Sequence, residues 1–387
     1  MRLITSLGLC LMLACVGFGA IAGTVDRAPL PVWALDEPVP AADPAQADHR
    51  VGGVDYRLVD TQIRWQPGLQ ENLYRTVFHV ESRSGLEEAA RITKDFDPAH
   101  ERLVLHHVRL KRDGVWIDVT DRIHFELLRR ETDLEDSWMI DGHLTALAYI
   151  PDVRVGDLVD TAVSWVETPI IAKSHVTVKA RASWGVPVSL ARLRVIGPPD
   201  REIQIRQTDS IAPPRIERSE EALIHEWRTG NIAPVESERH TPAWHNPNDR
   251  ISISSMRGWE EVVDDILPLY SEIHALPASF AAELNAALEG AQTPLDRMSR
   301  ALHLVQNRIR YVGIELGDGA YHPRPPELTV ARGYGDCKDK SVLLITALRS
   351  LGIEAYPVLA HTSTGHGIDP GLPTPYVFNH ILVAAEI

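Results

Sequence analysis

The chain reads Gly335-Asp336-Cys337-Lys338-Asp339-Lys340-Ser341 and then continues into the apolar run Val342-Leu343-Leu344-Ile345. Gly335 permits a tight turn of the backbone, and Asp336 is a favourable N-cap for the helix that the apolar run predicts. Asp339 stands three residues after Asp336, where an acidic side chain completes a capping box. The sequence therefore predicts a helix that ends near Gly352 and carries Cys337 in its first turn.

Cys337 lies where a helix presents unpaired backbone N–H groups and the positive end of its dipole. With Lys338 and Lys340 nearby in sequence, this setting predicts a thiol pKa below the ordinary value of about 8.5. Other interpretations fit less well. A phosphate-binding loop needs glycine where Asp339 stands, and a lone cysteine is a poor start for a zinc site. A well-capped helix with an incidental, inert cysteine is the plain alternative, because capping alone explains both aspartates.

A histidine follows the cysteine helix on a predicted strand. Residues 354–359 read as one strand, and residues 376–385, which contain Phe378-Asn379-His380, read as its antiparallel neighbour. A lone histidine on a strand is usually structural. Opposite a cysteine at a helix N-terminus, however, His380 is a candidate proton acceptor.

The bulk composition excludes several classes of partner. The chain has 387 residues, 44% of them hydrophobic, and a net charge of −14 with its acidic residues spread along the sequence. This length predicts two or three domains, and no basic face stands out. We therefore expect neither nucleic acid nor an anionic membrane surface as a partner. Nothing in the sequence implies a cofactor or a metal, and no loop has the acidic spacing of a calcium site.

The N-terminus reads as a secretory signal peptide over residues 1–22. Arg2 supplies the positive charge, residues 7–18 form a short apolar stretch, and Ala20-Ile21-Ala22 fits a cleavage site. We expect an exported, periplasmic protein. Met12-Leu13-Ala14-Cys15 loosely resembles a lipid-attachment box, but Met12 fits that position poorly. Of the three cysteines, cleavage would leave Cys337 alone, so no internal disulfide is expected.

The period of the apolar residues changes along the chain and predicts an α+β fold. Residues 23–50, rich in Pro, Ala and Asp, read as a linker, and residues 51–235 read as short strands of an antiparallel sandwich. A second linker is expected over 236–250. From 251 to 387 the pattern becomes helical, with helices over 259–270 and 278–288. A further helix begins at Thr293-Pro294-Leu295-Asp296, where Thr293 and Asp296 form a capping box and Leu295 begins the apolar face.

These motifs resemble a known family. The stretch Tyr334 to Ser341, followed by a helix, a strand and Phe378-Asn379-His380, is similar to the transglutaminase-like core of bacterial exported proteins, within the papain-like cysteine peptidase superfamily. The upstream stretches Ser82 to Glu87, Phe96-Asp97-Pro98, Arg112-Asp113-Gly114 and Val155-Gly156-Asp157 are similar to a domain of unknown function that often precedes this core. Together the two resemblances extend from about residue 51 to the end of the sequence.

The resemblance implies a Cys-His-Asp triad in that chain order. Cys337 matches the nucleophile and His380 the base. The family's aspartate lies on the strand after the histidine, and the printed residues after His380 contain none. Glu386 is six strand residues from His380, roughly 20 Å away, too far to orient its ring. We therefore expect the acid to lie outside this chain, or the C-terminal part of the core to be incomplete. The Cys337 N–H and Tyr311 are the candidate oxyanion donors.

Two functions remain open. A thiol acyl-transfer enzyme would attack a peptide or amide carbonyl with Cys337 and would pass the acyl group to water or to an amine. The alternative is a non-catalytic binding or scaffold protein of the cell envelope with an incomplete core. The sequence does not separate hydrolysis from transfer, and it does not identify the substrate, the pathway or the oligomeric state.

Overall fold

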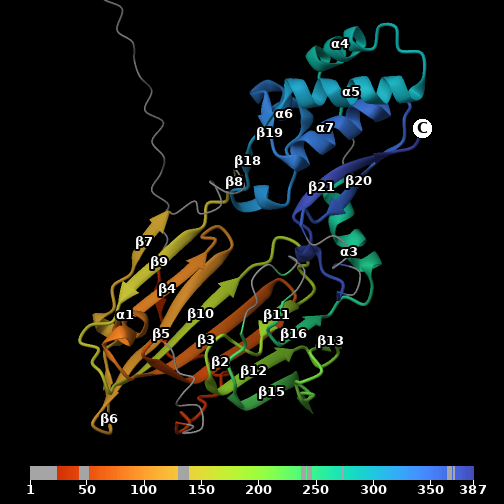
Figure 1. Cartoon of the computed structure of the whole chain (residues 1–387). Helices are drawn as coiled ribbons and strands as arrows, with labels where there is room; N and C mark the ends of the chain where they lie inside the picture. The colour runs from red at the N-terminus through yellow and green to blue at the C-terminus, as the bar shows by residue number, and fades with distance from the viewer. Residues whose placement is uncertain are drawn as a thin grey trace, which may run out of the picture.

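The computed structural model describes residues 24–42, 52–129, 139–236, 241, 246–271, 274–363, 368 and 371–387. The predicted signal peptide lies outside the described residues, as does part of the second predicted linker. The fold is mixed α+β, as the sequence predicts, with a β-rich region first and a helical core after it. Figure 1 shows the β-rich region in red to green and the core in teal to blue.

A large twisted sheet dominates the β-rich region. Its order is β1-β5-β10-β3-β2-β12-β15-β14, with β6 paired to β5. The pairs β1/β5 and β2/β12 are parallel and the others are antiparallel. Asp113 and Gly114 form the turn between β5 and β6, and both have positive φ. The strands, in sheet order and ending with β6, are Asp26–Arg27, Glu101–Arg112, Leu158–Glu167, Leu69–Val80, Val54–Gln66, Val188–Gly197, Leu223–Ile232, Arg215–Arg218 and Val115–Asp118.

Two smaller sheets cover the apolar face of the large sheet and make the region sandwich-like. The first, β4-β9-β7 (Arg91–Phe96, Leu144–Tyr149, Glu126–Arg129), packs Phe96 and Ala146 against Leu103 and Val159. The second, β11-β16-β13 (Thr177–Arg181, Arg250–Ser254, Gln204–Gln207), packs every other side chain on β2, β12 and β15. Because strand side chains alternate between faces, the polar residues of β11, β16 and β13 point outward. β16 thus belongs to the β-rich region, although the sequence places 251 at the start of the core.

The opposite face of the large sheet is polar and is crossed by an N-terminal strap, residues 33–39. Leu35 exchanges two backbone hydrogen bonds with the amide of Gln62, at 3.0 and 2.8 Å. Glu37 lies 2.8 Å from the guanidinium of Arg192, which also pairs with the buried Asp60 at 2.7 Å. The sequence predicts a linker here, whereas the strap is attached to the sheet, because it gives buried arginines such as Arg192 further partners besides the acids of the sheet.

The core packs helices α3 to α7 against a strand pair. Helix α7 (Cys337–Ser350) lies at its centre, and Leu343, Ala347 and Leu348 form one buried cluster with Phe280 and Val305. Helices α4 (Ala278–Ala287), α5 (Pro294–Arg308) and α6 (Pro326–Arg332) surround it, and α3 (Trp259–Ile266) continues as the 3₁₀ turn η4 (Leu267–Tyr270). β20 (Ala355–Ala360) pairs antiparallel with β21 (His380–Ala385). Within the described part of the chain, no helix has the length and apolar character of a membrane span.

Direct contacts join the β-rich region to the core. β8 (Met139–Ile140) and β18 (Gly313–Ile314) form a parallel pair. The Ala172 N–H donates to Asp265 at 2.6 Å, and the Tyr376 hydroxyl donates to the carbonyl of Ile171 at 3.1 Å. Ile171 also belongs to the apolar cluster that contains Cys337. The β-rich region therefore forms one wall of the space beside the cysteine helix.

Candidate thiol site

Helix α7 begins with the capping box that the sequence predicts. The Asp336 carboxylate accepts from the N–H groups of Lys338 and Asp339, at 2.9 and 3.1 Å, and Asp339 accepts in return from the Asp336 N–H at 3.3 Å. Gly335 is required by close approach, since a Cβ at that position would lie 2.7 Å from the Cβ of Asp339. This cap holds Cys337 in the first helical turn, next to the two-residue strand β19 (Tyr334–Gly335).

A buried network of charges surrounds the cap. Lys338 Nζ lies 2.8 Å from Glu315 and 3.0 Å from the second oxygen of Asp336. Arg324 donates to Asp339 through its backbone N–H, at 2.7 Å, and through its guanidinium, at 3.0 Å. These carboxylates neutralise Lys338 and hold its pKa above the ordinary value despite its burial. Sequence reasoning missed Glu315 and Arg324, because both are distant in the chain and carry no local signal.

The thiol of Cys337 is in a less polar setting than the sequence predicts. Burial raises the pKa of Cys337 above its ordinary value, while Lys338 and the backbone N–H of Ile381 lower it in part. The ammonium group of Lys340 donates to the Ile309 carbonyl at 2.7 Å. The expectation of a lowered pKa is therefore wrong in this structure: the nearby positive charge is paired with carboxylates, and desolvation of the sulfur outweighs the rest.

His380 lies next to a residue that contacts the thiol, but its own ring is on the other face of the strand. It begins β21, and the following residue, Ile381, packs in the apolar cluster with Cys337 and donates its N–H toward the sulfur. Because side chains alternate along a strand, the His380 ring lies on the side of Leu382, which is 51% exposed. No hydrogen bond links His380 to Cys337 among the described residues. The structure thus brings the predicted pair to neighbouring positions without joining them.

Tyr311 lies beside the cysteine motif, where the sequence predicts a donor. β17 (Arg310–Tyr311) pairs parallel with β19, which aligns Tyr311 with Gly335. Burial of its hydroxyl, and next the charge of Cys337, raise the pKa of Tyr311 to about 12. The phenol is therefore protonated at neutral pH and able to donate a hydrogen bond. No measurement tests its role in an oxyanion hole, which stays a prediction.

Sequence reasoning missed a second tyrosine next to the thiol. Tyr270, at the end of η4, is buried in the same apolar cluster as Cys337. Burial first, and then the charge of Cys337 among others, raises the pKa of Tyr270. No sequence signal could have found it, since it ends an ordinary helical segment far upstream. Glu386, in contrast, accepts from the Tyr356 hydroxyl at 3.0 Å, which agrees with its exclusion as the partner of His380.

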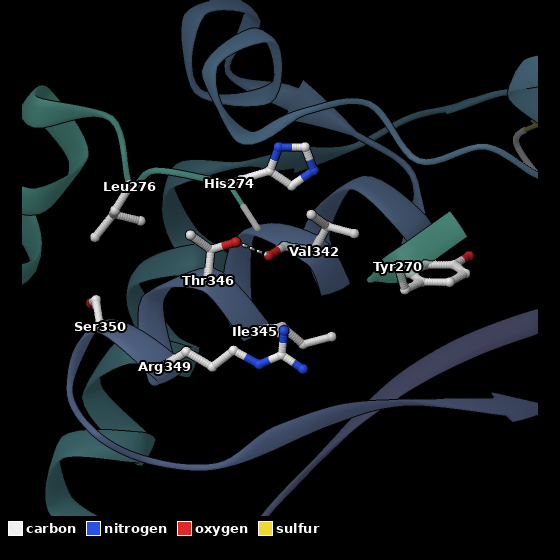
Figure 2. Close-up of a pocket in the computed structure, with 8 residues that line it drawn as sticks. All are labelled: Tyr270, His274, Leu276, Val342, Ile345, Thr346, Arg349 and Ser350. Atoms are coloured by element: carbon white, nitrogen blue, oxygen red, sulfur yellow. Dashed lines mark hydrogen bonds between the residues drawn. The ribbon is translucent and has the colours of Figure 1, made fainter. Parts of the chain in front are cut away.

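A cavity of about 350 Å³ runs along the face of α7 that carries Val342, Thr346 and Arg349. In Figure 2, His274 and Tyr270 border this cavity, and the Thr346 hydroxyl donates to the Val342 carbonyl at 2.8 Å. Arg349 donates to the carbonyl of Ala355. Cys337 is not among the residues that line the cavity, so we assign it to helix packing rather than to the thiol site.

The described residues contain one group with the donors for a metal ion, Asp55, His79 and Glu81, in the β-rich region. Arg57 Nε lies 2.5 Å from Asp55, so a guanidinium already occupies the carboxylate that a metal would need. This group lies on β2, on β3 and just beyond β3, outside the core that carries Cys337. It gives the thiol site no metal chemistry.

The second domain has a capped cysteine helix packed on an antiparallel strand pair, and comparison with protein families gives its class. Two family models match the chain: one described as the transglutaminase-like superfamily matches residues 282–373, and one described as a domain of unknown function (DUF3857) matches residues 66–236. The first of these matches ends before His380. The chain thus carries a DUF3857 domain followed by a transglutaminase-like core.

A solved structure from Parabacteroides distasonis, described as "a putative protease", has the same architecture. It aligns with a TM-score of 0.67 and 13% identity, over 86% of this chain and 65% of that chain. This chain therefore spans about two-thirds of that protein's length, and the likeness shows the fold alone. An M1 zinc metallopeptidase from Deinococcus radiodurans aligns with a TM-score of 0.29 and 11% identity, over 65% of this chain and 53% of that chain. No curated protein matches the chain.

Proposed function

We propose that the chain carries the thiol site of an acyl-transfer enzyme that acts on peptide or amide bonds. The supporting observation is the position of Cys337 in the first turn of α7, with the Ile381 N–H directed at its sulfur. His380 is the residue before Ile381 on β21. A nucleophile on a helix anchored in the core, with a candidate base on the adjacent strand, is the arrangement that covalent thiol catalysis needs.

In this mechanism His380 removes the thiol proton as the Cys337 sulfur bonds to the substrate carbonyl carbon. The backbone N–H of Cys337 and the Tyr311 hydroxyl donate to the oxyanion. The carbon–nitrogen bond then breaks, and the leaving amine takes the proton from His380. Water or a second amine attacks the thioester and releases Cys337 as a thiol. Because burial raises the thiol pKa, we propose proton removal during the attack rather than a preformed ion pair. The His380 ring lies on the Leu382 face of β21, so this step also needs a backbone change at the start of β21 that brings the ring to the sulfur.

Acylation by p-nitrophenyl acetate tests this proposal without a known substrate. We expect a burst of p-nitrophenolate and an acetyl group on Cys337, located by peptide mass spectrometry. Cys337→Ala should abolish this modification, and His380→Ala should slow it by about 10²- to 10⁴-fold. His303→Ala, at an exposed position of α5, is the matched control and should leave the rate unchanged. Equal rates in the wild type and His380→Ala would refute His380 as the base.

The same assay separates hydrolysis from transfer. Glycine amide added to the acetylated enzyme would yield acetylglycine amide if the site accepts amines, and acetate alone if it excludes them. A protease-like site predicts acetate, and a transglutaminase-like site predicts the amide product.

A non-catalytic cell-envelope module is the second candidate. The raised pKa of Cys337 favours it, as does the lack of a described hydrogen bond between Cys337 and His380. Failure of acylation in a folded protein would support this reading. For either function we propose export to the periplasm, which rests on the signal-like residues 1–22.

A further inference from the structure

The outward face of the sheet β11-β16-β13 gathers cationic side chains. The strand register aligns Lys179 of β11 with Ser252 of β16, and Ser252 with Arg206 of β13. The same register places Arg181 opposite Arg250. Their neighbours along each strand pack into the apolar cluster beneath, so these four basic side chains share the exposed face.

These basic side chains are not paired with acids within the described part of the chain, although Asp95 and Glu101 line a small cavity together with Lys179. None of the four basic residues takes part in an ion pair with any residue there. Like charges placed side by side across strands destabilise a sheet, and the chain as a whole has a net charge of −14. Folding stability therefore does not explain the cluster, whereas binding of an anion does.

This face borders a cavity of about 630 Å³ at the junction with the core. Lys179, Arg206 and Arg250 line it from the sheet, and Tyr376 lines it from the segment before β21. Glu167 is the only acidic side chain among the described residues of its lining. Tyr376 packs edge-on against Tyr321 at 6.1 Å, and Tyr321 belongs to the apolar cluster of Cys337. Tyr376 thus connects the lining of the cavity, through Tyr321, to the apolar cluster that contains Cys337.

The free-edge strand β11 lines this cavity through Thr177 and Lys179, and the same residues line a second cavity of about 350 Å³ beside the large sheet. β11 ends its sheet, and the Ser255 N–H donates to the Val176 carbonyl, so residues 176, 178 and 180 exchange the hydrogen bonds with β16. In an antiparallel pair the alternate residues direct their backbone groups to the other side. Those residues are Thr177, Lys179 and Arg181, and their backbone groups have no hydrogen-bond partner in the described chain.

We propose that this edge and the cationic face together bind an extended acidic peptide segment. The peptide backbone pairs with Thr177 and Lys179 as an added strand. Its carboxylates contact Lys179, Arg206 and Arg250, and the bound segment extends past Tyr376 to present an amide carbonyl to Cys337. A peptide fits both features at once, since a glycan or a free anion would use the charges and leave the strand edge unpaired. Only the last step, presentation to the thiol, rests on the function proposed above.

A fluorescein-labelled peptide of alternating Glu and Val, titrated by fluorescence anisotropy, tests the binding step. We expect saturable binding that weakens with salt, and binding at least about tenfold weaker to Lys179→Gln/Arg206→Gln. Arg297→Gln, an exposed charge change on α5, should bind like the wild type. Lys179→Pro should bind more weakly than Lys179→Gln, because it removes an edge N–H as well as the charge. Circular dichroism would verify folding of each variant.

The outcomes separate this proposal from the catalytic one. Cys337→Ala should bind the peptide like the wild type. If the wild type binds the peptide but p-nitrophenyl acetate does not acylate its Cys337, the thiol function is refuted and the peptide site stands. Binding of dextran sulfate but not of the peptide would refute the peptide and assign the face to an anionic glycan. Equal binding by the wild type and Lys179→Gln/Arg206→Gln, or no binding of either probe, would overturn the proposal.

Discussion

Cys337 experiences two opposing effects at the scale of a single residue. Its position at a helix N-terminus favours the thiolate, whereas its partial burial favours the neutral thiol, and burial raises its pKa. A raised acid pKa means that less thiolate is present at a given pH. We therefore expect alkylation of Cys337 by iodoacetamide to be slower at neutral pH than for a free cysteine, and to rise only above about pH 8.5.

Peptide-resolved mass spectrometry of the carboxamidomethylated Cys337, across a pH series, measures this titration. The urea-unfolded protein is the control and should follow an ordinary cysteine. A labelling rate that is already maximal at neutral pH would show instead that His380 or Lys338 holds a thiolate.

Local contacts explain what the sequence could predict at this scale. Asp336 and Asp339 cap their own helix within three residues, so the motif itself predicts their role. The partners that determine the thiol's surroundings, Glu315 and Tyr270, come from other elements. Their distances follow from tertiary packing, which no motif encodes.

At the scale of elements, two helices begin with the same motif in different surroundings. The capping box of α7 is buried and its Asp336 also pairs with Lys338, whereas the box formed by Thr293 and Asp296 at α5 is exposed. Asp336→Ala would remove a cap and leave a buried lysine with one partner fewer, so we expect a loss of about 3–5 kcal/mol in unfolding free energy. Thr293→Ala should lose only about 1 kcal/mol.

Urea denaturation followed by circular dichroism measures both losses. Similar losses in the two variants would mean that the buried charges around α7 add nothing to the cap. The exposed box also shows the limit of periodicity: Leu295 begins the predicted apolar face of α5 but is 54% exposed, since the packed neighbours meet the helix only further along. A sequence pattern predicts which face is apolar, and the rest of the fold decides how much of that face is covered.

At the scale of the whole molecule, the junction of the two regions contains an acid with an unusual pKa. Glu167 ends β10 directly opposite Glu101, and it lines the junction cavity with Tyr376 of the core. Burial, and next the charge of Glu101, raises the pKa of Glu167 to about 7. The folded state therefore prefers the protonated acid, while the unfolded chain ionises near the ordinary value of about 4.3.

This difference makes the stability of the folded chain depend on pH. The favourable contribution of neutral Glu167 is fully present below about pH 4.3 and is lost as the pH rises through about 7. Glu167→Gln keeps the neutral shape at every pH. We expect it to change stability little at about pH 5 and to raise the unfolding free energy by up to about 3 kcal/mol at about pH 8. Urea denaturation at both pH values measures the difference. An equal gain at both, or none at pH 8, would contradict a neutral carboxyl at the domain junction, because only a charge that is unfavourable in the folded state can make the benefit of the amide grow with pH.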